Sequence, residues 1–553
     1  MKASEIRQSF ISFFEEKNHQ LVRSSSVVPV DDPTLLFTNA GMNQFKPILL
    51  GEKEANPSRA VNSQKCIRVS GKHNDLEEVG IDGFHHTFFE MLGNWSFGDY
   101  YKKDAIRWAW EYFTEVLKLD KNRLFVSVYI DDDEALDLWV NLTDIDPNRV
   151  LKFGKKDNFW EMGETGPCGP CSEIHYYMGE DISNIDPAGV NTTDEYWELW
   201  NLVFIQYNRQ TDGSLEDLPA KHVDTGAGLE RIVSVMQGKS SNYDTDLFTP
   251  IIQSIESMTG KSSEGDSVPF QVIADHIRML SFTIADGALP SNDGRGYVLR
   301  RILRRAARFG RILDQHDPFL FQLVEPVVNI MGDIYPELKE KQAHIEKIIQ
   351  SEEMSFNKTL DRGIQHFEKY IGKIEGDIIP GAEAFKLYDT YGFPLDLTEL
   401  MARENNLSVD NDGFDQEMKK QKARAKAAGK FKTNTELEWN IVSDGFDSMF
   451  VGYRLLEGNF SIRRWASSGD LTIIVLDSTP FYAESGGQVG DIGLISGDGF
   501  SVRVKDVKKD GDTFFHYCDG FIPESALDEQ VYCKVDDEIR QAIRLNHSAT
   551  HLM

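Results

Sequence analysis

The hydrophobic pattern of this 553-residue chain changes twice, and these changes constrain its fold more than any other feature. Residues 1 to about 245 mix helical patterns with apolar strands, such as LFVSVYI at Leu124–Ile130. From about residue 250 to 430, apolar residues recur at helical spacing, as in Val272–Ala285. After about residue 440, short strands alternate with Gly and Asp turns. The pattern predicts a multidomain α+β protein of three or four domains.

The predicted domain boundaries lie where the pattern changes. We expect residues 1–245 to form an antiparallel sheet flanked by helices, 246–438 a helical domain, and 439–535 a small β-barrel. Residues 536–553 begin another helix, and the chain stops inside it at Met553. We therefore expect a C-terminally truncated part of a longer protein.

Composition narrows the cellular setting. No stretch approaches the roughly 20 apolar residues of a membrane span, and the N-terminus lacks the pattern of a secretory signal, so we expect no membrane partner. An odd, sparse set of cysteines argues against a disulfide framework and favours a reducing cytoplasm. The five cysteines are Cys66, Cys168, Cys171, Cys518 and Cys533.

Charge gives two opposite indications about nucleic acids. The net charge of −30 argues against phosphate binding when it is taken for the whole chain. Binding uses local patches, however, and two segments differ sharply from the average. Residues 295–311 contain seven arginines and no acid, and residues 418–432 contain seven Lys or Arg and no acid. Either segment could contact nucleic acid.

Two clusters have residue types suited to nucleotide chemistry. The first joins Arg68-Val-Ser-Gly-Lys-His-Asn-Asp75 to the string HHTFFEMLGN at 85–94. Arginine suits bidentate phosphate contacts, and an aromatic face suits stacking on a purine. The second is VDTGAGLER at 223–231, where two glycines permit close approach to a ligand. The alternatives are a polar loop between strands and an ordinary strand–turn–helix junction.

Together the clusters resemble motifs 2 and 3 of the class II aminoacyl-tRNA synthetases. Nine sequence motifs resemble those of the alanine-specific family in both sequence and order, and the resemblance covers nearly the whole chain. No glycine-rich P-loop is present, and no GxGxxG follows a strand. The strings are RVSGKHNDLEEVG, HHTFFEMLGN, TGPCGPCSEIH, VDTGAGLER, IADGALPSN, RGYVLRR, YDTYGFPLDLT, FYAESGGQVGD and RLNHSATHLM.

The resemblance implies a class II antiparallel sheet that binds ATP in a bent form, with Mg²⁺. It implies that Arg68 holds the α-phosphate, Arg231 the γ-phosphate, and Phe89 stacks on adenine. Asp224 would bind the α-ammonium group of alanine. The predicted catalytic residues are therefore Arg68, Asp224 and Arg231. The other predicted ATP contacts are His73, Met91 and Gly228. The other predicted alanine contacts are Trp160, Asn201, Val203 and Gly226.

The arginine-rich segment is a predicted tRNA contact. At i, i+4 spacing its arginines would share one broad basic face of a helix; the alternative is a solvated surface stripe. The predicted contacts are Arg300, Arg301, Arg304, Arg305 and Arg308. By resemblance, Asn292 and Asp389 match readers of a G·U pair in the acceptor stem of tRNA(Ala). Without the resemblance, both would be turn or cap residues.

Two further groups suggest metals. His547 and His551 lie one helical turn apart, which is half of a Zn²⁺ site. The resemblance implies that an editing domain completes this site in the full-length protein, where it would hydrolyse Ser-tRNA(Ala) and Gly-tRNA(Ala). Cys168, Cys171 and His175 supply three possible ligands without an obvious fourth, and a tight active-site loop is the alternative.

The resemblance implies an alanine-tRNA ligase, an enzyme that makes alanyl-adenylate from alanine and ATP and transfers alanine to tRNA(Ala). One alternative is a catalytically inactive tRNA-binding relative. A second alternative is a stand-alone deacylase that clears Ser-tRNA. The intact triad of Arg68, Asp224 and Arg231 speaks against the first alternative, and the complete N-terminal half speaks against the second.

Overall fold

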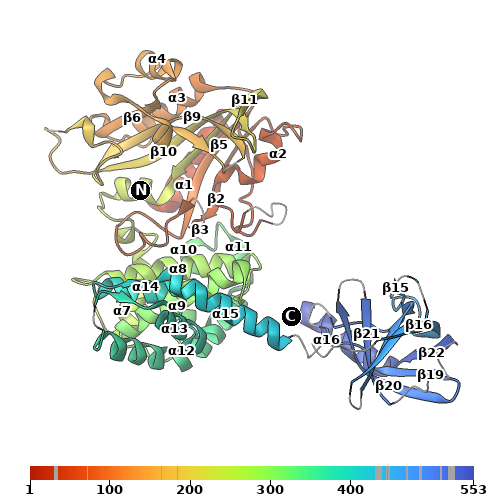
Figure 1. Ribbon diagram of the computed structural model, residues 1–553. Coiled ribbons are helices and arrows are strands. Elements are labelled where there is room, and N and C mark those ends of the chain that lie inside the picture. The colour runs from red at the N-terminus through yellow and green to blue at the C-terminus, as the bar shows by residue number, and fades with distance from the viewer. Residues whose placement is uncertain are drawn as a thin grey trace. The chain divides into compact units, whose positions relative to one another are not determined.

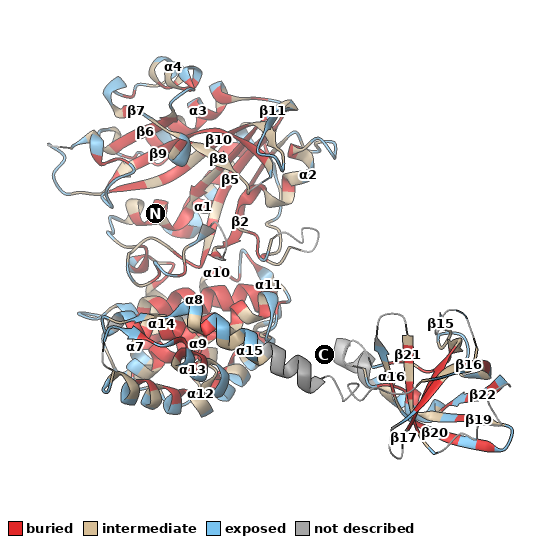
Figure 2. Ribbon diagram, viewed as in Figure 1, coloured by how far each residue is buried: buried red, intermediate tan, exposed pale blue. Residues whose placement is uncertain are grey.

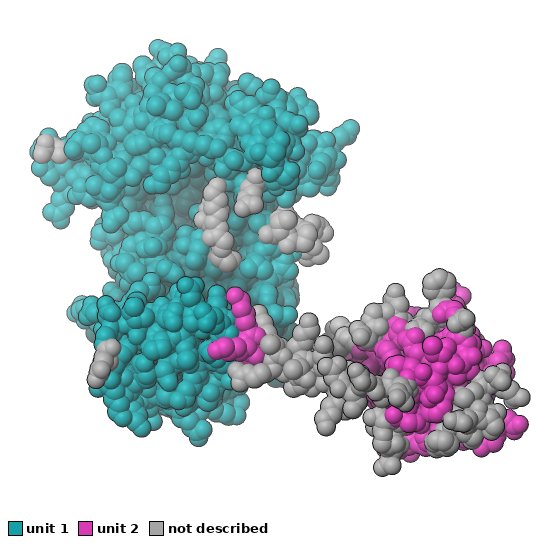
Figure 3. Space-filling model, in the orientation of Figure 1, with its two compact units in different colours: residues 1–417 teal, residues 418–553 magenta. Residues whose placement is uncertain are grey.

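The chain divides into two compact units, Met1–Glu417 and Met418–Met553, in the computed structural model (Figure 3). The structure describes residues 1–29, 35–70, 73–163, 165–183, 185–374, 376–429, 439–443, 445, 449–468, 471–484, 488–510, 513–520 and 530–552. The predicted boundary at residue 245 falls inside the first unit, and that at 438 falls inside the second. The four predicted domains stay predictions.

A nine-stranded sheet forms one half of the first unit (Figure 1). Adjacent strands of the sheet pair antiparallel, except for the parallel pairs β1–β2 and β6–β7 at its two edges. β8 (Phe159–Glu161) pairs with β9 off the main path. The main strand order is β1 (Gln20–Leu21), β2 (Arg59–Ile67), β5 (Phe88–Phe97), β11 (Leu215–Gly228), β10 (Tyr196–Arg209), β9 (Gly166–Tyr177), β6 (Leu124–Tyr129) and β7 (Val150–Phe153).

Helices cover one face of this sheet because apolar side chains repeat on one side of each helix. In α1 (Ala3–Glu16), Phe10 and Phe14 lie four residues apart and are both buried. Their rings pack against Trp200 of β10, at centroid distances of 5.4 and 6.2 Å. α3 (Lys102–Glu111) and α6 (Leu229–Gln237) also contact β10. The predicted class II arrangement of a sheet flanked by helices is confirmed.

A helical layer completes the first unit. Its centre is α8 (Val268–Ala285), which is buried along almost its whole length (Figure 2). The ring of Phe282 in α8 stacks on Phe88 of β5 at 4.1 Å, so the core of the sheet continues into the helices. This continuity explains why the first unit extends past residue 245. The other described helices here are α7 (Thr249–Thr259), α9 (Gly294–Ile312), α10 (Val324–Met331), α11 (Pro336–Glu340), α12 (Gln342–Ile371), α13 (Gly381–Tyr391) and α14 (Leu395–Glu404).

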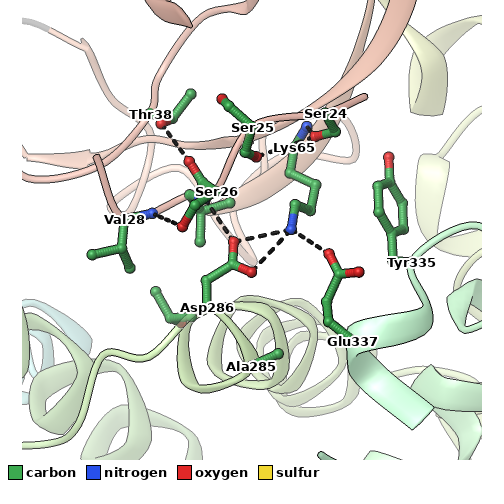
Figure 4. A network of polar contacts seen from close by, with 12 residues as sticks. Ser24, Ser25, Ser26, Val28, Thr38, Lys65, Ala285, Asp286, Tyr335 and Glu337 are labelled. Carbon is green, nitrogen blue, oxygen red and sulfur yellow. Dashed lines mark hydrogen bonds and ion pairs between the residues drawn. The ribbon is translucent and has the colours of Figure 1, made fainter. Parts of the chain in front are cut away.

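A buried ionic network joins the sheet to this layer (Figure 4). The ammonium group of Lys65, on β2, lies 2.9 Å from Asp286 and 2.6 Å from Glu337. Its side chain is 2% exposed. Burial alone would raise the pKa of Glu337, but the hydrogen bond from Lys65 lowers it below its ordinary value. Lys65 therefore serves both acids at once. Asp286 also accepts a 2.7 Å hydrogen bond from the backbone N–H of Val27, and Glu337 also pairs with Arg23 at 3.2 Å.

The second unit is a closed β-barrel, as predicted. Its strands pair antiparallel in a ring, because β16 contacts both β17 and β22. Arg540 ties the following helix, α16 (Asp537–Leu552), to the barrel through Asp491 and the carbonyl oxygen atoms of Gly452 and Pro480. The ring order is β16 (Glu457–Ser468), β17 (Leu471–Leu476), β21 (Thr513–Asp519), β20 (Phe500–Asp510), β19 (Gly493–Gly497) and β22 (Gln530–Val535).

Within the described ranges, no helix combines the length and the apolar character needed to cross a bilayer.

Replacing Lys65 with methionine is expected to destabilise the first unit by about 3–5 kcal/mol at pH 7, because two largely buried acids lose their cation. The pKa of Glu337 is lowered in the folded wild type, so the part of the deficit that comes from Glu337 should shrink as the pH falls through this lowered pKa. Urea or thermal unfolding at pH 7 and at successively lower pH measures this. The control is Lys339→Met, whose ion pair with Asp333 is exposed and should contribute at most about 1 kcal/mol. Equal losses in the two variants would contradict the assignment.

Candidate active site

A cavity of about 250 Å³ opens on the sheet face opposite α1 and α3. Its lining residues come from distant parts of the chain, from Ala40 to Asn242, and the predicted ones among them from Arg68 to Arg231. The side chain of one predicted contact, His73, lies outside the described residues. The predicted residues that line the cavity are Arg68, Phe89, Met91, Trp160, Asn201, Val203, Asp224, Gly226, Gly228 and Arg231.

Strand alternation explains why β10 supplies both core and site residues. Successive side chains of a strand point to opposite faces of the sheet. Trp200 packs against the helices, and Phe204 packs against Tyr101. Asn201 and Val203 point the other way and line the cavity. The pairs Asn201–Gly226 and Val203–Asp224 then place the motif of β11 directly beside them.

Asp224 is the buried acid of the cavity. It is 6% exposed, and its Oδ1 accepts a 2.6 Å hydrogen bond from the indole N–H of Trp95. Burial raises the pKa of Asp224 to about 7, and the hydrogen bond from Trp95 offsets only part of this effect. A cation bound beside Asp224 would stabilise its ionised form. The site is therefore suited to an ammonium group.

Two arginines bring positive charge to the cavity. The guanidinium group of Arg68 lies over the ring of Phe89, 5.0 Å from its centroid. Arg231 is in the first turn of α6, where it donates a 2.9 Å hydrogen bond to the carbonyl oxygen of Glu198. Its guanidinium group lies 5.2 Å from the ring centroid of Phe84. Both cations and both rings border one space that can hold a phosphorylated, aromatic ligand.

Gly226 and Met91 limit the space near Asp224. A Cβ atom at Gly226 would lie 2.7 Å from the sulfur of Met91, so a larger residue would collide there. The backbone N–H of Gly41 contacts the same sulfur at 3.3 Å, which holds the Met91 side chain in place. Trp160 and Val203 close other parts of the lining. A small side chain is the kind of substrate group that this corner can accept.

Sequence reasoning missed some of the lining residues. His85 is one of these residues, and its Nδ1 lies 2.5 Å from the carboxylate of Asp82. Burial alone would raise the pKa of Asp82, but the hydrogen bonds from His85 lower it below its ordinary value. Glu198 also lines the cavity and is the partner of Arg231 through its backbone. His85 lies in the HHTFFEMLGN string, so that signal could have found it. No motif around Glu198 predicts its place in the cavity, because that place depends on how β10 pairs with its neighbouring strands.

A fully buried carboxylate fixes the start of β5 beside the cavity. Asp275 of α8 accepts a 3.0 Å hydrogen bond from the backbone N–H of Thr87 and lies 3.3 Å from Nδ1 of His86. It also lies 2.9 Å from Nδ1 of His276. Burial alone would raise the pKa of Asp275, but the hydrogen bonds from His276 and His86 lower it well below its usual range. His276 in turn lies 3.2 Å from Arg305 of α9.

The arginines of α9 are largely engaged inside the first unit. Arg305 and Arg308 are only 6% and 8% exposed, so they do not form part of a solvated stripe. Arg305 donates to the carbonyl oxygen atoms of Leu76 and Val79, and Arg301 donates to that of Val69. The predicted basic face therefore packs partly against the loop after Arg68. The reason is that backbone carbonyl groups of this loop need donors, which the helix supplies.

The other predicted tRNA contacts remain near the surface. Asn292 and Asp389 are exposed. Arg300 contacts the side chain of Asn292 and forms an ion pair with Glu352 at 2.7 Å. Arg304 shares Glu352 and also contacts the carbonyl oxygen of Gly392, just after α13. This cluster joins the turn that holds Asn292 to the end of the helix that holds Asp389.

The comparisons with known proteins decide the family. A family model described as "tRNA synthetases class II (A)" matches residues 5–539. The chain belongs to this family of synthetases. Relatives named "Alanine--tRNA ligase" match the whole chain: one from Chlorobium phaeovibrioides is 52% identical, one from Chlorobium phaeobacteroides 53%, and one from Legionella pneumophila 48%. The chain spans 65% of the length of each of these relatives.

A solved structure of apo histidyl-tRNA synthetase from S. aureus also matches part of this chain. It is 9% identical, has a TM-score of 0.27, and covers 44% of this chain and 67% of its own. At this score, the match carries no argument about the site.

The two groups of predicted metal ligands differ in what the structure describes of them. The side chains of His547 and His551 lie outside the described residues, although their backbone is part of α16. Cys168, Cys171 and His175 are buried on β9. Burial raises the pKa of Cys168 to about 11, which disfavours the thiolate that metals bind. Among the described side chains, no group of three or more His, Cys, Asp or Glu is arranged to hold a metal ion.

Replacing Asp224 with asparagine is expected to stabilise the protein at pH 8. In the folded chain the pKa of Asp224 is about 7, above its unfolded value of about 4, so the ionised form destabilises the fold as the pH rises between these values. The gain should be on the order of 2–4 kcal/mol above pH 7 and disappear near pH 4. Unfolding curves across this range measure it. A gain that does not change with pH would refute a raised pKa. The control, Asp333→Asn on the surface, should give no such gain.

Proposed function

We propose that this synthetase activates alanine with ATP and transfers it to tRNA(Ala). The supporting observation is the single cavity that gathers a buried carboxylate, two arginines and a small corner. The names of relatives about 50% identical over the whole chain point to the same amino acid. Because the chain spans 65% of their length, the activity of the whole protein stays a proposal.

The first step is a displacement at phosphorus. The alanine carboxylate attacks the α-phosphorus of ATP, the bond to the β-phosphate oxygen breaks, and pyrophosphate leaves. The nucleophile is already ionised, so no general base is needed. In this proposal, Arg68 neutralises the α-phosphate, Arg231 the γ-phosphate, and Phe89 stacks on adenine. Positioning and charge neutralisation do most of the work in this class of reaction.

The second step transfers the alanyl group. A terminal ribose hydroxyl of tRNA attacks the acyl carbon, and AMP leaves with the bonding electrons. Asp224 would keep hold of the α-ammonium group through both steps, which fixes the position of the acyl carbon. Trp160, Val203 and Gly226 would surround the methyl group. The corner bounded by Met91 suits this group by size.

Mg²⁺ fits the chemistry of the cavity. It prefers oxygen ligands from carboxylates and phosphates, and Glu198 places a carboxylate residue in the lining beside Arg231. Glu198 would hold the ion together with phosphate oxygen atoms. When bound, Mg²⁺ neutralises charge on the phosphates and so assists departure of pyrophosphate.

Editing, zinc binding and cytoplasmic location belong to this proposal for the longer protein. His547 and His551 would give two of the Zn²⁺ ligands, and hydrolysis would remove serine or glycine from tRNA(Ala). The motive is physical: a small pocket separates such close analogues by only about 10–200-fold. The sparse cysteines support a reducing cytoplasm.

ATP–pyrophosphate exchange with alanine, glycine and serine tests the activity. Alanine should give the highest kcat/KM, with glycine and serine about 10–200-fold lower. Asp224→Ala should abolish exchange while Asp333→Ala on the surface leaves it intact. Absence of exchange with all three amino acids would favour an inactive tRNA-binding relative. Hydrolysis of Ser-tRNA(Ala) without exchange would favour the deacylase alternative.

The tRNA contacts are tested by Asn292→Ala and Asp389→Ala. Each should lower kcat/KM for aminoacylation about tenfold, because each would remove a polar contact to the acceptor stem. Both should leave ATP–pyrophosphate exchange within about twofold, since that step does not use tRNA. The control is Asn148→Ala, at an exposed turn of the sheet half. Loss of exchange in either variant, or full aminoacylation in both, would contradict the proposed contacts.

A further inference from the structure

One row of residues runs across four neighbouring strands beneath the cavity. Gly226 of β11 lies directly opposite Asn201 of β10, and Asn201 lies opposite Glu173 of β9. Glu173 in turn lies opposite Ser127 of β6. Directly opposed residues point to the same face of a sheet. The row therefore extends from Gly226, which lines the cavity, to Ser127, which is buried in the sheet.

Hydrogen bonds connect the polar members of this row. Asn201 donates from Nδ2 to Oε1 of Glu173 at 3.0 Å, and Ser127 donates to Oε2 of Glu173 at 3.1 Å. Asn158 supports the far end by donating to the hydroxyl of Ser127 at 2.9 Å. Nε2 of His175 lies 3.3 Å from Oε2 of Glu173. Glu173 and Ser127 are buried, so no solvent competes for these contacts.

The carboxylate of Glu173 determines which way the Asn201 amide points. Burial and the nearby Glu198 raise the pKa of Glu173, and its Oε1 accepts from Nδ2 of Asn201, so the NH₂ group of Asn201 faces Glu173. The amide oxygen is then turned away from Glu173. Among the described residues, this oxygen is buried and finds no hydrogen-bond partner. Asn201 lines the cavity, so a donor bound there could satisfy its oxygen.

We propose that Glu173 is a positioning residue for the amino-acid substrate. It holds the amide of Asn201 so that Oδ1 accepts a hydrogen bond from the substrate α-ammonium group, beside Asp224. This inference rests on the proposed function. A reversed amide would present its NH₂ group to a cation, which is repulsive. Glu173 thus acts on substrate affinity through Asn201, without touching the substrate.

Glu173→Leu tests the proposal, because leucine has a similar size and cannot accept from Asn201. Alanine-dependent exchange should show a rise of about tenfold in KM for alanine. The KM for ATP and kcat should stay within about twofold. Glu173→Gln keeps an acceptor oxygen, so it should restore KM to within about threefold of the wild type. Equal effects of leucine and glutamine would indicate that charge, and not the amide orientation, is responsible.

A double-mutant cycle separates positioning from general destabilisation. In an Asn201→Ala background, Glu173→Leu should raise KM for alanine no further, because the group it positions is absent. Additive effects would overturn the proposal. The matched control is Glu353→Leu, at a buried glutamate of α12 that accepts from the backbone of Phe319 and Leu320. It should lower stability and leave KM for alanine unchanged.

Ser127→Ala covers the case in which Glu173→Leu does not fold. It removes the hydrogen bond from Ser127 to Oε2 of Glu173, which leaves His175 beside that oxygen. It should raise KM for alanine two- to threefold, an increase that vanishes when Asn201 is alanine. An unchanged KM in this variant would overturn the proposal. If the wild-type protein exchanges with alanine and these variants match it, the positioning role alone fails. If the wild type shows no alanine-dependent exchange, the proposed function is wrong, and the positioning role that rests on it is wrong as well.

Discussion

The buried carboxylate of Asp275 determines how the two halves of the first unit are joined. It binds the start of β5 through the backbone of Thr87, and it contacts His276, which reaches Arg305 of α9. A single acid therefore links the cavity wall, the central helix and the arginine-rich helix. Its bonds come from several donors, so its burial is compensated. The site and the proposed tRNA contacts are thereby built on one connected core.

Asp224 shows the opposite balance. Both aspartates are buried, yet the pKa of Asp224 is raised to about 7 whereas that of Asp275 is lowered. The difference is the number of donors: Asp224 accepts a described hydrogen bond from Trp95, whereas two histidines and a threonine serve Asp275. Asn201 adds a buried amide oxygen without a described partner beside the same cavity. Such uncompensated polar groups are typical of binding sites, where a ligand supplies what the fold does not.

The arginine-rich helix shows where a sequence pattern is ambiguous. Seven arginines without an acid predict a basic surface when the helix is considered alone. In the folded unit, Arg301 and Arg305 bind backbone carbonyl groups, and Arg300 and Arg304 share Glu352. Those partners come from segments about 50 to 230 residues away in the chain. Helical spacing shows which arginines are neighbours, but it does not show what packs against them.

The sequence by itself determined the class of each segment and most residues of the candidate site. Local periodicity and strand alternation are properties of neighbouring residues, so they predict the sheet, the helical layer and the barrel. Ordered motifs likewise pointed to Arg68, Phe89, Asp224 and Arg231. Only the tertiary structure decided that the core continues past residue 245, that Arg305 and Arg308 are buried, and that Glu173 lies opposite Asn201. These features depend on contacts between distant segments, and such contacts form only when the chain has folded.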